Sequence, residues 1–307
     1  MNIIKSVLDP KDGYCLRLGN GQGWHIIATE GVEFWLKQLA HIMELQEREP
    51  DEYPRIIFVP KQTEKESNGG PVGHLHPKLK DDLPLFGWEH QDFVWLQIWS
   101  HREVPDFICE MGSQEGDEQE ILKMRMALQP IYQRIQNSGG SPLHAALLER
   151  DGLGILLAGS GSTGKSTCCR RVNGPWRALC DDEALIVKDN KKGYLVHPFP
   201  TWSDYFSNRS KQTWDVQHYL PMSAIFFLEQ AEADQVIPIG QGRAAADLYE
   251  SATQVCARSW MKLNRAGLSI VRKSLFENVC DLAKEIPVFK LQVSLGGNFW
   301  KEMEKVL

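Results

Sequence analysis

The chain has 307 residues, of which 42% are hydrophobic and 24% charged, as in an ordinary soluble protein. This length is enough for two domains, or for one large domain with a substantial core. The formal net charge of −6 argues against general nucleic-acid binding, which favours a basic surface, although it leaves room for a local basic patch.

Cysteine usage and hydropathy point to a reducing compartment. The seven cysteines include no C-x-x-C pair and are odd in number, so neither a disulfide framework nor a zinc knuckle is expected. The opening MNIIKSVLDPKDGY lacks the long apolar run and the cleavage site of a signal peptide. No stretch approaches the roughly 20 apolar residues of a membrane span. We therefore predict a cytoplasmic protein with no membrane partner.

The first half of the chain predicts a small α+β domain. Apolar residues at helical spacing indicate a helix at 32–45, and a second helix is expected at 117–136, kinked or broken at Pro130. Residues 61–70 are polar and indicate a surface loop. Strands are predicted from short apolar or alternating segments at residues 14–18, 24–28, 55–59, 93–99 and 107–111, the first two joined by a hairpin-like turn.

A run of turn-forming residues, Asn137-Ser-Gly-Gly-Ser-Pro142, predicts a domain boundary. We place an α+β recognition or scaffold domain at residues 1–138 and a second domain at 139–307. The second half alternates strands and helices, which favours an α/β sheet that binds nucleotide at the carboxyl ends of its strands. Strands are predicted at 154–158, 178–180, 185–187, 224–228 and 288–293, and helices at 165–172, 244–256, 259–282 and 299–306.

A phosphate-binding motif lies at the start of this second domain. Gly159-Ser160-Gly161-Ser162-Thr163-Gly164-Lys165-Ser166 fits G-x-x-x-x-G-K-[ST], the Walker A motif or P-loop. Glycines let backbone N–H groups turn toward phosphates, and the helix that follows presents its positive end to the anion. Lys165 is expected to reach the β and γ phosphates, and the Ser166 hydroxyl to bind Mg²⁺.

The context of the motif decides between two interpretations. A flexible glycine and serine loop on the surface is the alternative. The motif follows an apolar strand and opens a helical stretch, as phosphate binding requires, which favours the P-loop. The predicted nucleotide site therefore comprises residues 159–166 together with Thr167 in the first helical turn, and its ligands are ATP or another nucleoside triphosphate and Mg²⁺.

Two carboxylates follow the next predicted strand. In Ala178-Leu179-Cys180-Asp181-Asp182-Glu183, Asp181 and Asp182 end an apolar segment where metal and γ-phosphate are expected. One carboxylate can hold Mg²⁺ and the other can accept a proton from an attacking hydroxyl. A helix cap or an acidic turn is the alternative, and the preceding P-loop favours the functional interpretation.

His144 begins the extended segment that leads toward the P-loop strand. A hairpin through Asp151-Gly152 would return the chain to that strand and bring His144 near the carboxylates. A satisfied core histidine is the alternative, and the residues alone favour it.

These residues resemble those of the HPr serine kinases and phosphoenolpyruvate carboxykinase-like P-loop proteins. In HPr kinases a histidine stands 15 residues before the first P-loop glycine, as His144 does before Gly159. The paired aspartates match Asp181 and Asp182, with about one extra residue between them and the loop. The resemblance implies a general base at Asp181, assisted by His144, with Asp182 near the metal and Lys165 on the phosphates.

The resemblance covers residues 141–187 well and the remainder loosely. The carboxy-terminal glycine-rich signature of HPr kinases is not recognisable, and the length does not suit a carboxykinase. The whole chain looks more like HPr-kinase-like proteins encoded beside ribosomal-peptide maturation genes, such as the SynChlorMet cassette type. That resemblance implies phosphorylation of a serine on a precursor peptide, and HPr kinases form oligomers, so a homo-oligomer is implied by resemblance only.

Three further segments are weighed. Gly73-His74-Leu75-His76 has the H-x-H pattern of a zinc site, but a surface loop between flanking prolines is several times more expected. Residues 197–206 mix aromatic residues with proline; they either shape an acceptor site, with Arg209 and Lys211, or form an ordinary packed loop. Arg243 is a second candidate for contacting phosphate.

The leading functional hypothesis is an ATP-dependent kinase that transfers the γ-phosphoryl group to a serine, or other hydroxyl, of a peptide or small protein. A nucleotide-gated binding module without phosphate transfer is the main alternative, and a simple ATPase is the third. Detection of a phosphorylated acceptor separates them.

Overall fold

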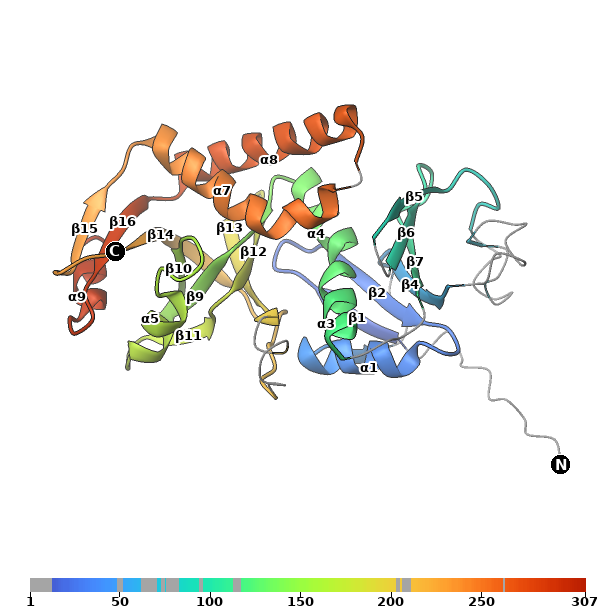
Figure 1. Ribbon diagram of the computed structural model, residues 1–307, viewed down its shortest axis with the longest axis horizontal. Coiled ribbons are helices and arrows are strands. Elements are labelled where there is room, and N and C mark those ends of the chain that lie inside the picture. Colours follow the sequence, from blue (N-terminus) through green and yellow to red (C-terminus); the bar gives the residue numbers. More distant parts are fainter. Residues whose placement is uncertain are drawn as a thin grey trace. The chain divides into compact units, whose positions relative to one another are not determined.

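The computed structural model describes residues 13–48, 52–61, 71–72, 75, 83–93, 96–112, 117–202, 205, 211–261 and 263–307, with no side-chain description for 117–119. Two compact units make up the chain (Figure 1): Met1–Arg17 with Gly21–Pro130, and Leu18–Asn20 with Ile131–Leu307. This division lies several residues before the predicted boundary, and the domains 1–138 and 139–307 stay a prediction. No helix within the described ranges is long and apolar enough to cross a membrane.

The first unit contains a seven-stranded mixed sheet in the order β3-β1-β2-β4-β7-β6-β5. β2, β4 and β7 are parallel and the other pairs are antiparallel, so the parallel strands form the centre. The strands are β1 (Gly13–Arg17), β2 (Gly23–Ala28), β3 (Gln46–Arg48), β4 (Arg55–Pro60), β5 (Glu89–Asp92), β6 (Leu96–Ser100) and β7 (Phe107–Met111).

The hairpin of β1 and β2 confirms the turn predicted there. The strand predicted at 93–99 is present as β6 but begins later, at Leu96, and the N–H of Phe93 donates to Leu96 O at 2.7 Å. Helix α1 (Glu33–Ile42) confirms the helix predicted at 32–45 and buries Trp35, which packs against Phe58 with ring centroids 4.8 Å apart. The polar loop predicted at 61–70 lies outside the described residues, apart from Lys61.

The long helix expected at 117–136 is two helices, α3 (Asp117–Met126) and α4 (Gln129–Asn137). Pro130 lies in the first turn of α4, where its missing N–H removes no helical hydrogen bond. The predicted break at this proline is therefore confirmed.

The second unit is built on a nine-stranded mixed sheet. Its main path is β11-β9-β10-β14-β13-β12-β8, and β16 continues from β14 with β15 at its edge. β10, β14 and β16 run parallel to one another and the remaining pairs are antiparallel. The strands are β8 (Ser141–Leu143), β9 (Ala145–Arg150), β10 (Leu153–Ala158), β11 (Arg177–Cys180), β12 (Glu183–Asp189), β13 (Gly193–Phe199), β14 (Leu220–Gln230), β15 (Gln235–Pro238) and β16 (Val288–Val293).

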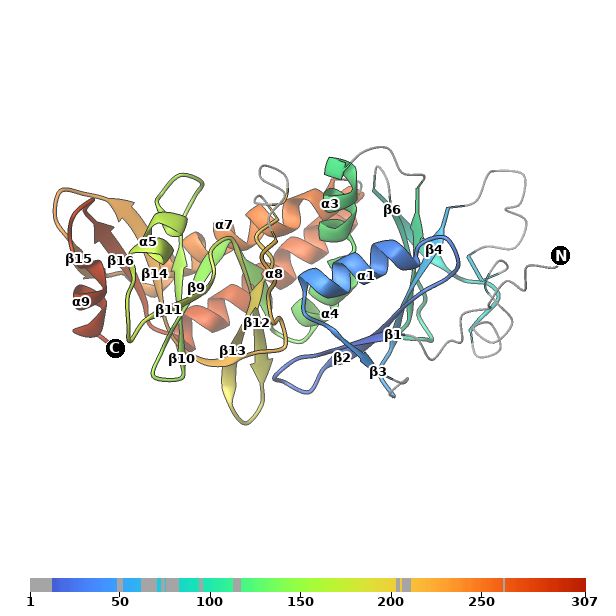
Figure 2. The ribbon, with the colours of Figure 1, turned by 90° about the horizontal axis from the view of Figure 1, so that it is seen from below.

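Helices cover both faces of this sheet, as expected for an α/β fold. Helices α5 (Lys165–Arg171) and α9 (Phe299–Glu304) lie on one face, and α7 (Gln241–Trp260) and α8 (Arg265–Glu285) lie on the other. Figure 2 shows α5 and α9 in front of the sheet and α7 and α8 behind it. The helix predicted at 259–282 begins later, because Asn264 caps α8 by accepting the N–H of Gly267 at 2.8 Å.

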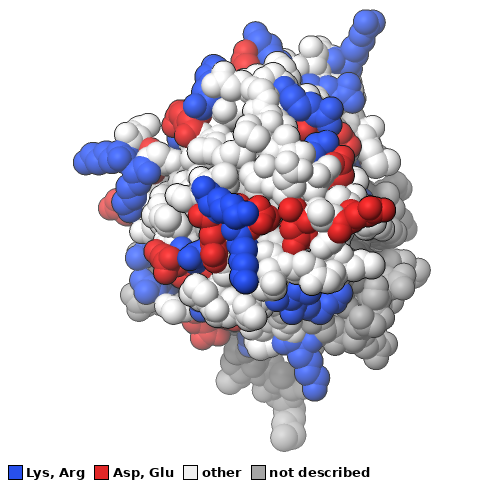
Figure 3. All heavy atoms as spheres, turned by 90° about the vertical axis from the view of Figure 1, so that its left-hand side faces the viewer, with Lys and Arg blue, Asp and Glu red and all other residues white. Residues whose placement is uncertain are grey.

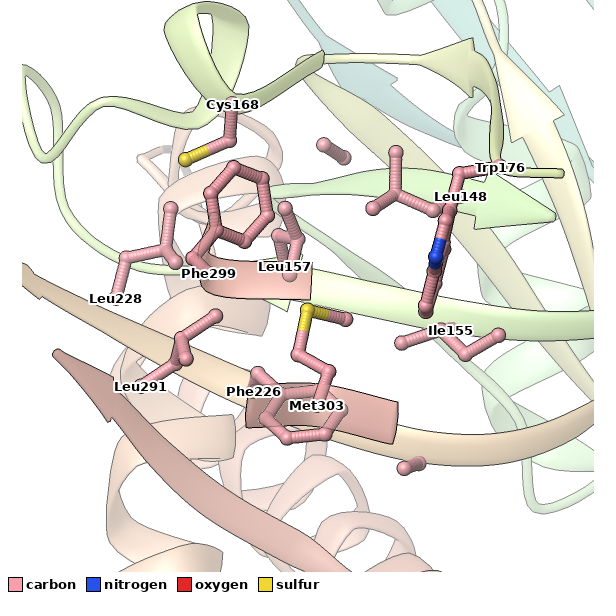
Figure 4. Close-up of a cluster of buried hydrophobic side chains, with 12 residues drawn as sticks. Leu148, Ile155, Leu157, Cys168, Trp176, Phe226, Leu228, Leu291, Phe299 and Met303 are labelled. Atoms are coloured by element: carbon pink, nitrogen blue, oxygen red, sulfur yellow. The ribbon is translucent and has the colours of Figure 1, made fainter. Parts of the chain in front are cut away.

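Beneath α5, a buried cluster fixes the strand and helix that flank the glycine-rich loop (Figure 4). Side chains alternate along a strand, so Ile155 and Leu157 of β10 face this cluster. Cys168 of α5 and Phe299 of α9 meet them there. Burial of this kind stabilises by about 25 cal/mol per Å² of apolar surface, and here it holds β10 and α5 at a fixed relative position.

Candidate functional site

The 159–166 loop connects β10 to α5, as the motif predicts. Three of its residues have positive φ, namely Gly159 at 153°, Ser162 at 65° and Gly164 at 107°. A Cβ at Gly159 would also lie 2.8 Å from Thr163 Oγ1, so a side chain does not fit without a shift. The Thr163 hydroxyl donates to Ser160 O at 2.9 Å and closes the loop upon itself. The loop is thus a defined turn that needs glycine at its two ends.

Lys165 is buried although it carries a charge. Its Nζ donates to Gly159 O at 2.8 Å and to Ser160 O at 3.2 Å, and lies 2.9 Å from His144 Nε2. Burial lowers the pKa of Lys165 below its usual value of 10.5, and the charges of Asp182 and Asp181 oppose that shift. The ammonium therefore sits among neutral acceptors at the loop, where an anion would stabilise it.

His144 lies between β8 and β9 and is held through its backbone. Its N–H donates to Ser251 O of α7 at 3.3 Å, and the Ser251 hydroxyl donates to His144 O at 3.2 Å. Its ring Nδ1 lies 3.2 Å from Asp182 Oδ1. Because lysine is more basic than histidine, Lys165 donates to Nε2, and the ring proton resides on Nδ1 and points to Asp182. The geometry thus assigns a Lys165–His144–Asp182 chain of hydrogen bonds.

The hairpin predicted through Asp151-Gly152 brings His144 to this position. Both turn residues have positive φ, at 53° and 76°, and β9 and β10 pair from Leu153 with Arg150 to Ala158 with Ala145. Residues at the start of β9 therefore lie beside the end of β10, where the 159–166 loop begins. The placement of His144 near a carboxylate is confirmed, whereas its catalytic role stays a prediction.

Asp181 and Asp182 directly follow β11, which pairs with β9 on the side away from β10. The Thr201 hydroxyl donates to Asp181 Oδ1 at 2.6 Å and orients that carboxylate. Glu183 behaves differently, because it is buried at the start of β12 and accepts a hydrogen bond from Tyr132. The Asp-Asp-Glu triplet is thus divided into two residues at the site and one in the core.

Oxygen atoms around the loop suit phosphate and magnesium chemistry. The first hydrogen bond of helix α5 runs from the N–H of Cys168 to Gly164 O at 2.8 Å. The N–H groups of Lys165, Ser166 and Thr167 come before this bond, and such groups at the start of a helix have no acceptor within the helix. The Ser166 hydroxyl and the Asp182 carboxylate are the hard oxygen ligands that Mg²⁺ prefers. No group of three His, Cys, Asp or Glu side chains that could hold a metal occurs in the described part of the chain. Magnesium needs only one or two carboxylates in addition to phosphate and water.

A cavity of about 190 Å³ adjoins the other side of the loop. Gly159, Ser160 and Thr163 form one wall, and α7 and the ends of β14 and β16 form the others. Arg243 of α7 lies on this cavity, so the structure brings that predicted candidate to the loop. The full lining is Gly159, Ser160, Thr163, Phe227, Leu228, Glu229, Arg243, Asp247, Glu250, Ser251, Gln254 and Lys290.

The segment 197–206 is only partly a loop, which corrects the prediction. Residues 197–199 belong to β13, and His197 is buried and donates from Nδ1 to Val216 O at 2.8 Å. Residues 197–199 are therefore part of the sheet, where β13 pairs with β12. Thr201 does reach Asp181, while Arg209 and most of 203–210 lie outside the described residues and Lys211 is exposed. The H-x-H pair of His74 and His76 likewise lies outside them.

Sequence reasoning missed two contributors, Thr201 and the α7 side chains that line the cavity. Thr201 is 20 positions from Asp181 and meets it only because β12 and β13 form a hairpin. In contrast, α7 carries polar residues at intervals of three or four, at positions 243, 247, 250 and 254, and this signal could have been found.

The charge pattern does not form a single-sign field on the face drawn in Figure 3. Basic and acidic side chains lie side by side there. A surface that binds nucleic acid presents clustered positive charge, so this face does not have that character.

The second unit is a mixed α/β fold in which the inner strand β10, a glycine-rich loop and α5 follow one another along the chain. A family model described as SynChlorMet cassette protein ScmC matches residues 107–307. The match covers well over half of the chain, and the chain therefore belongs to this family. Among curated proteins, no match is found.

Proposed function

We propose that the protein is an ATP-dependent kinase of the HPr-kinase-like P-loop type. It binds ATP, or another nucleoside triphosphate, on residues 159–167. It transfers the γ-phosphoryl group to a serine or other hydroxyl of a peptide or small-protein acceptor. The Lys165–His144–Asp182 chain at the mouth of the loop is the observation that carries this proposal.

The contacts of Lys165 support a phosphate-binding role. A buried ammonium is costly unless opposite charge compensates it. Its direct acceptors are two backbone carbonyls and a neutral imidazole, and the carboxylates act on it only at longer range. A phosphate held by the glycine-rich loop would supply the compensating charge, and Lys165 would then stabilise charge that develops on the phosphoryl oxygens.

The acid pair divides into two roles in this proposal. Asp181 accepts the proton of the acceptor hydroxyl while the hydroxyl oxygen bonds to phosphorus and the bond from the γ-phosphorus to the β–γ bridging oxygen breaks, which releases the diphosphate. Thr201 orients Asp181 for this step. His144 contacts Lys165 through Nε2 and Asp182 through Nδ1, and so holds both side chains in place.

Ser166 and Asp182 would hold Mg²⁺ in this proposal. When bound, the ion would neutralise part of the negative charge of the phosphates. The oxygen atom of Asp182 that does not face His144 is the ligand consistent with the hydrogen bond to Nδ1.

The test is a transfer assay read by mass spectrometry. Purified protein, ATP and Mg²⁺ are mixed with serine- and threonine-containing peptides, preferably precursors encoded nearby. Wild type should add one phosphoryl group to an acceptor, whereas Lys165→Ala should add none. Arg170→Ala is the matched control, because Arg170 is an exposed cation on the same helix.

Other outcomes separate the alternatives. Nucleotide binding without transfer to any peptide, and without release of phosphate, would favour a nucleotide-gated binding module. Release of phosphate without an acceptor product would favour a simple ATPase. Failure of wild type to bind any nucleotide would reject all three functions.

A further inference from the structure

We propose that the cavity beside the 159–166 loop binds the nucleoside portion of the triphosphate, with Glu250 and Gln254 of α7 as its recognition residues. This inference rests on the proposed function, since it needs the phosphates to lie on the loop. It names a site that the sequence motif does not include.

The sheet order sets the direction in which a nucleotide would lie. β10, which ends in the loop, has β9 on one side and β14 on the other. The carboxylates lie beyond β9, after β11, whereas the cavity lies at the ends of β14 and β16. A phosphate chain has a reacting end and a nucleoside end. If the reacting end faces Asp181 and Asp182, the nucleoside end extends toward the cavity.

The cavity presents both hydrogen-bonding and apolar groups. Positions 243, 247, 250 and 254 lie three or four residues apart, so they share one face of α7. Facing them, the carboxyl end of β14 contributes the side chain of Phe227, whereas the side chain of Leu228 packs in the buried cluster on the opposite face of the sheet. A nucleoside combines hydroxyl groups with an aromatic ring, and polar side chains opposite an aromatic side chain suit both.

Existing contacts identify which polar groups are available. Glu229 accepts from Lys290 at 3.0 Å and from Gln292 at 2.8 Å, and Asp247 accepts from Arg243 at 2.8 Å. Within the described part of the chain, Glu250 makes no hydrogen bond or ion pair, although its charge interacts with that of Arg243. A carboxylate without such partners can accept ribose hydroxyls, as acidic residues do in dinucleotide sites. The Gln254 amide both donates and accepts, which suits the edge of a base.

Size favours a nucleoside over a protein segment. The cavity measures about 190 Å³. Sites that enclose a whole drug-sized ligand usually measure about 300–1,000 Å³. The space therefore suits a ribose with one edge of its base, and the remainder of the base would face solvent.

Calorimetric titration of the full chain with ATP and with inorganic triphosphate, both with Mg²⁺, tests the inference. ATP should bind wild type about tenfold more tightly than triphosphate. Glu250→Gln and Gln254→Ala should each weaken ATP binding by about 3- to 10-fold and leave triphosphate binding no weaker. Glu232→Gln, an exposed carboxylate outside the cavity lining, is the control and should change neither.

The electrostatic effect of the first variant sharpens the test. Removal of the Glu250 charge alone would strengthen binding of both anions. A loss confined to ATP therefore reports lost contacts with the nucleoside. Equal binding of ATP and triphosphate by wild type, or wild-type affinity of both variants for ATP, would overturn this inference alone. If neither ATP nor triphosphate binds the wild-type protein, the proposed function itself is rejected.

Discussion

Each unit buries one lysine within its described residues, and the two lysines have different partners. Lys123 of α3 is 1% exposed, and its Nζ donates to Glu120 Oε1 at 3.0 Å and to Gly112 O at 3.1 Å. Lys165 of α5 is 7% exposed, and it contacts two carbonyls and His144 without a direct carboxylate.

In the proposed kinase, we expect this difference to separate a structural lysine from one that binds phosphate. A direct carboxylate compensates Lys123 inside the fold, so its role is complete in the protein itself. Lys165 has its pKa lowered by burial, and the nearby acid pair offsets this only in part. Both lysines are buried, so burial alone does not distinguish them. We expect the direct partners of a buried lysine to indicate whether it binds an anionic ligand.

The acid residues extend the comparison and give the largest expected effect. Asp181→Asn should reduce phosphoryl transfer by roughly 10²- to 10⁴-fold with nucleotide binding retained, because it would remove the general base of the proposed reaction. Single-turnover transfer and calorimetric binding would measure the two separately. Asp281→Asn, at an exposed carboxylate on α8 of the same unit, is the control and should leave both unchanged. Full transfer activity in Asp181→Asn would exclude this role.

Asp106 is the contrasting carboxylate in the first unit. It accepts hydrogen bonds from Arg55 N at 2.6 Å and from Arg55 Nη2 at 2.7 Å. Asp106→Asn should lower the free energy of unfolding by about 1–3 kcal/mol without a comparable loss of transfer. A catalytic loss in a stably folded Asp106→Asn protein would contradict the comparison.

The lysines themselves give the next effect. Lys165→Met should weaken nucleotide binding by roughly 10- to 150-fold, since a charged hydrogen-bonding group to phosphate contributes about 1.5–3 kcal/mol. Lys123→Met should instead reduce stability by about 1–3 kcal/mol, because Glu120 loses its partner. Denaturant unfolding and nucleotide titration of both variants form the measurement. A reversal of the two phenotypes would break the comparison.

The next prediction concerns a buried histidine and the pH dependence of the free energy of unfolding. Burial lowers the pKa of His197 from 6.5 to about 4, chiefly by desolvation. Between pH 6.5 and pH 4 the imidazole is protonated in the unfolded chain but not in the native protein. The free energy of unfolding should therefore fall as pH falls through this range, by up to about 3 kcal/mol. Denaturant unfolding at pH 7 and pH 4.5 measures this loss. His197→Gln should show a smaller loss, and an unchanged pH dependence in the variant would contradict the assignment.

The smallest effect is expected at His144, which acts through its neighbours. His144→Gln should lower transfer by about tenfold, because the hydrogen-bonded chain between Lys165 and Asp182 is disturbed but both groups remain. The pH profile of transfer should change along with the rate. A His144→Gln enzyme with an unchanged rate and profile would exclude this positioning role.

Much of the fold follows from local signals. The apolar strand at 154–158, the helix after Lys165 and the turn at Asp151-Gly152 are each encoded by a few adjacent residues, and the structure contains all three. Strand β13 was not predicted, because Pro198 and the surrounding aromatic residues obscured a segment whose pairing with β12 is non-local.

The candidate site could likewise be predicted only in part from the sequence. The loop and the acid pair could be predicted because their residue types and spacing are characteristic. The contact of Thr201 with Asp181 and the cavity wall at α7 depend on sheet order, which spacing along the chain does not reveal. Arg243 was found on its own, without the neighbouring residues of the cavity.

The hairpin of β9 and β10 also affects the order in which the site assembles during folding. Its two-residue turn closes a short loop, and short loops cost little chain entropy. Strand β9, which His144 precedes, and strand β10, which leads into the 159–166 loop, can therefore pair early. Strand β14, which also pairs with β10, lies more than sixty residues farther along the chain and is expected to pair later. We expect substitutions at Gly152 to slow folding more than they accelerate unfolding, since local contacts of this kind form ahead of distant ones.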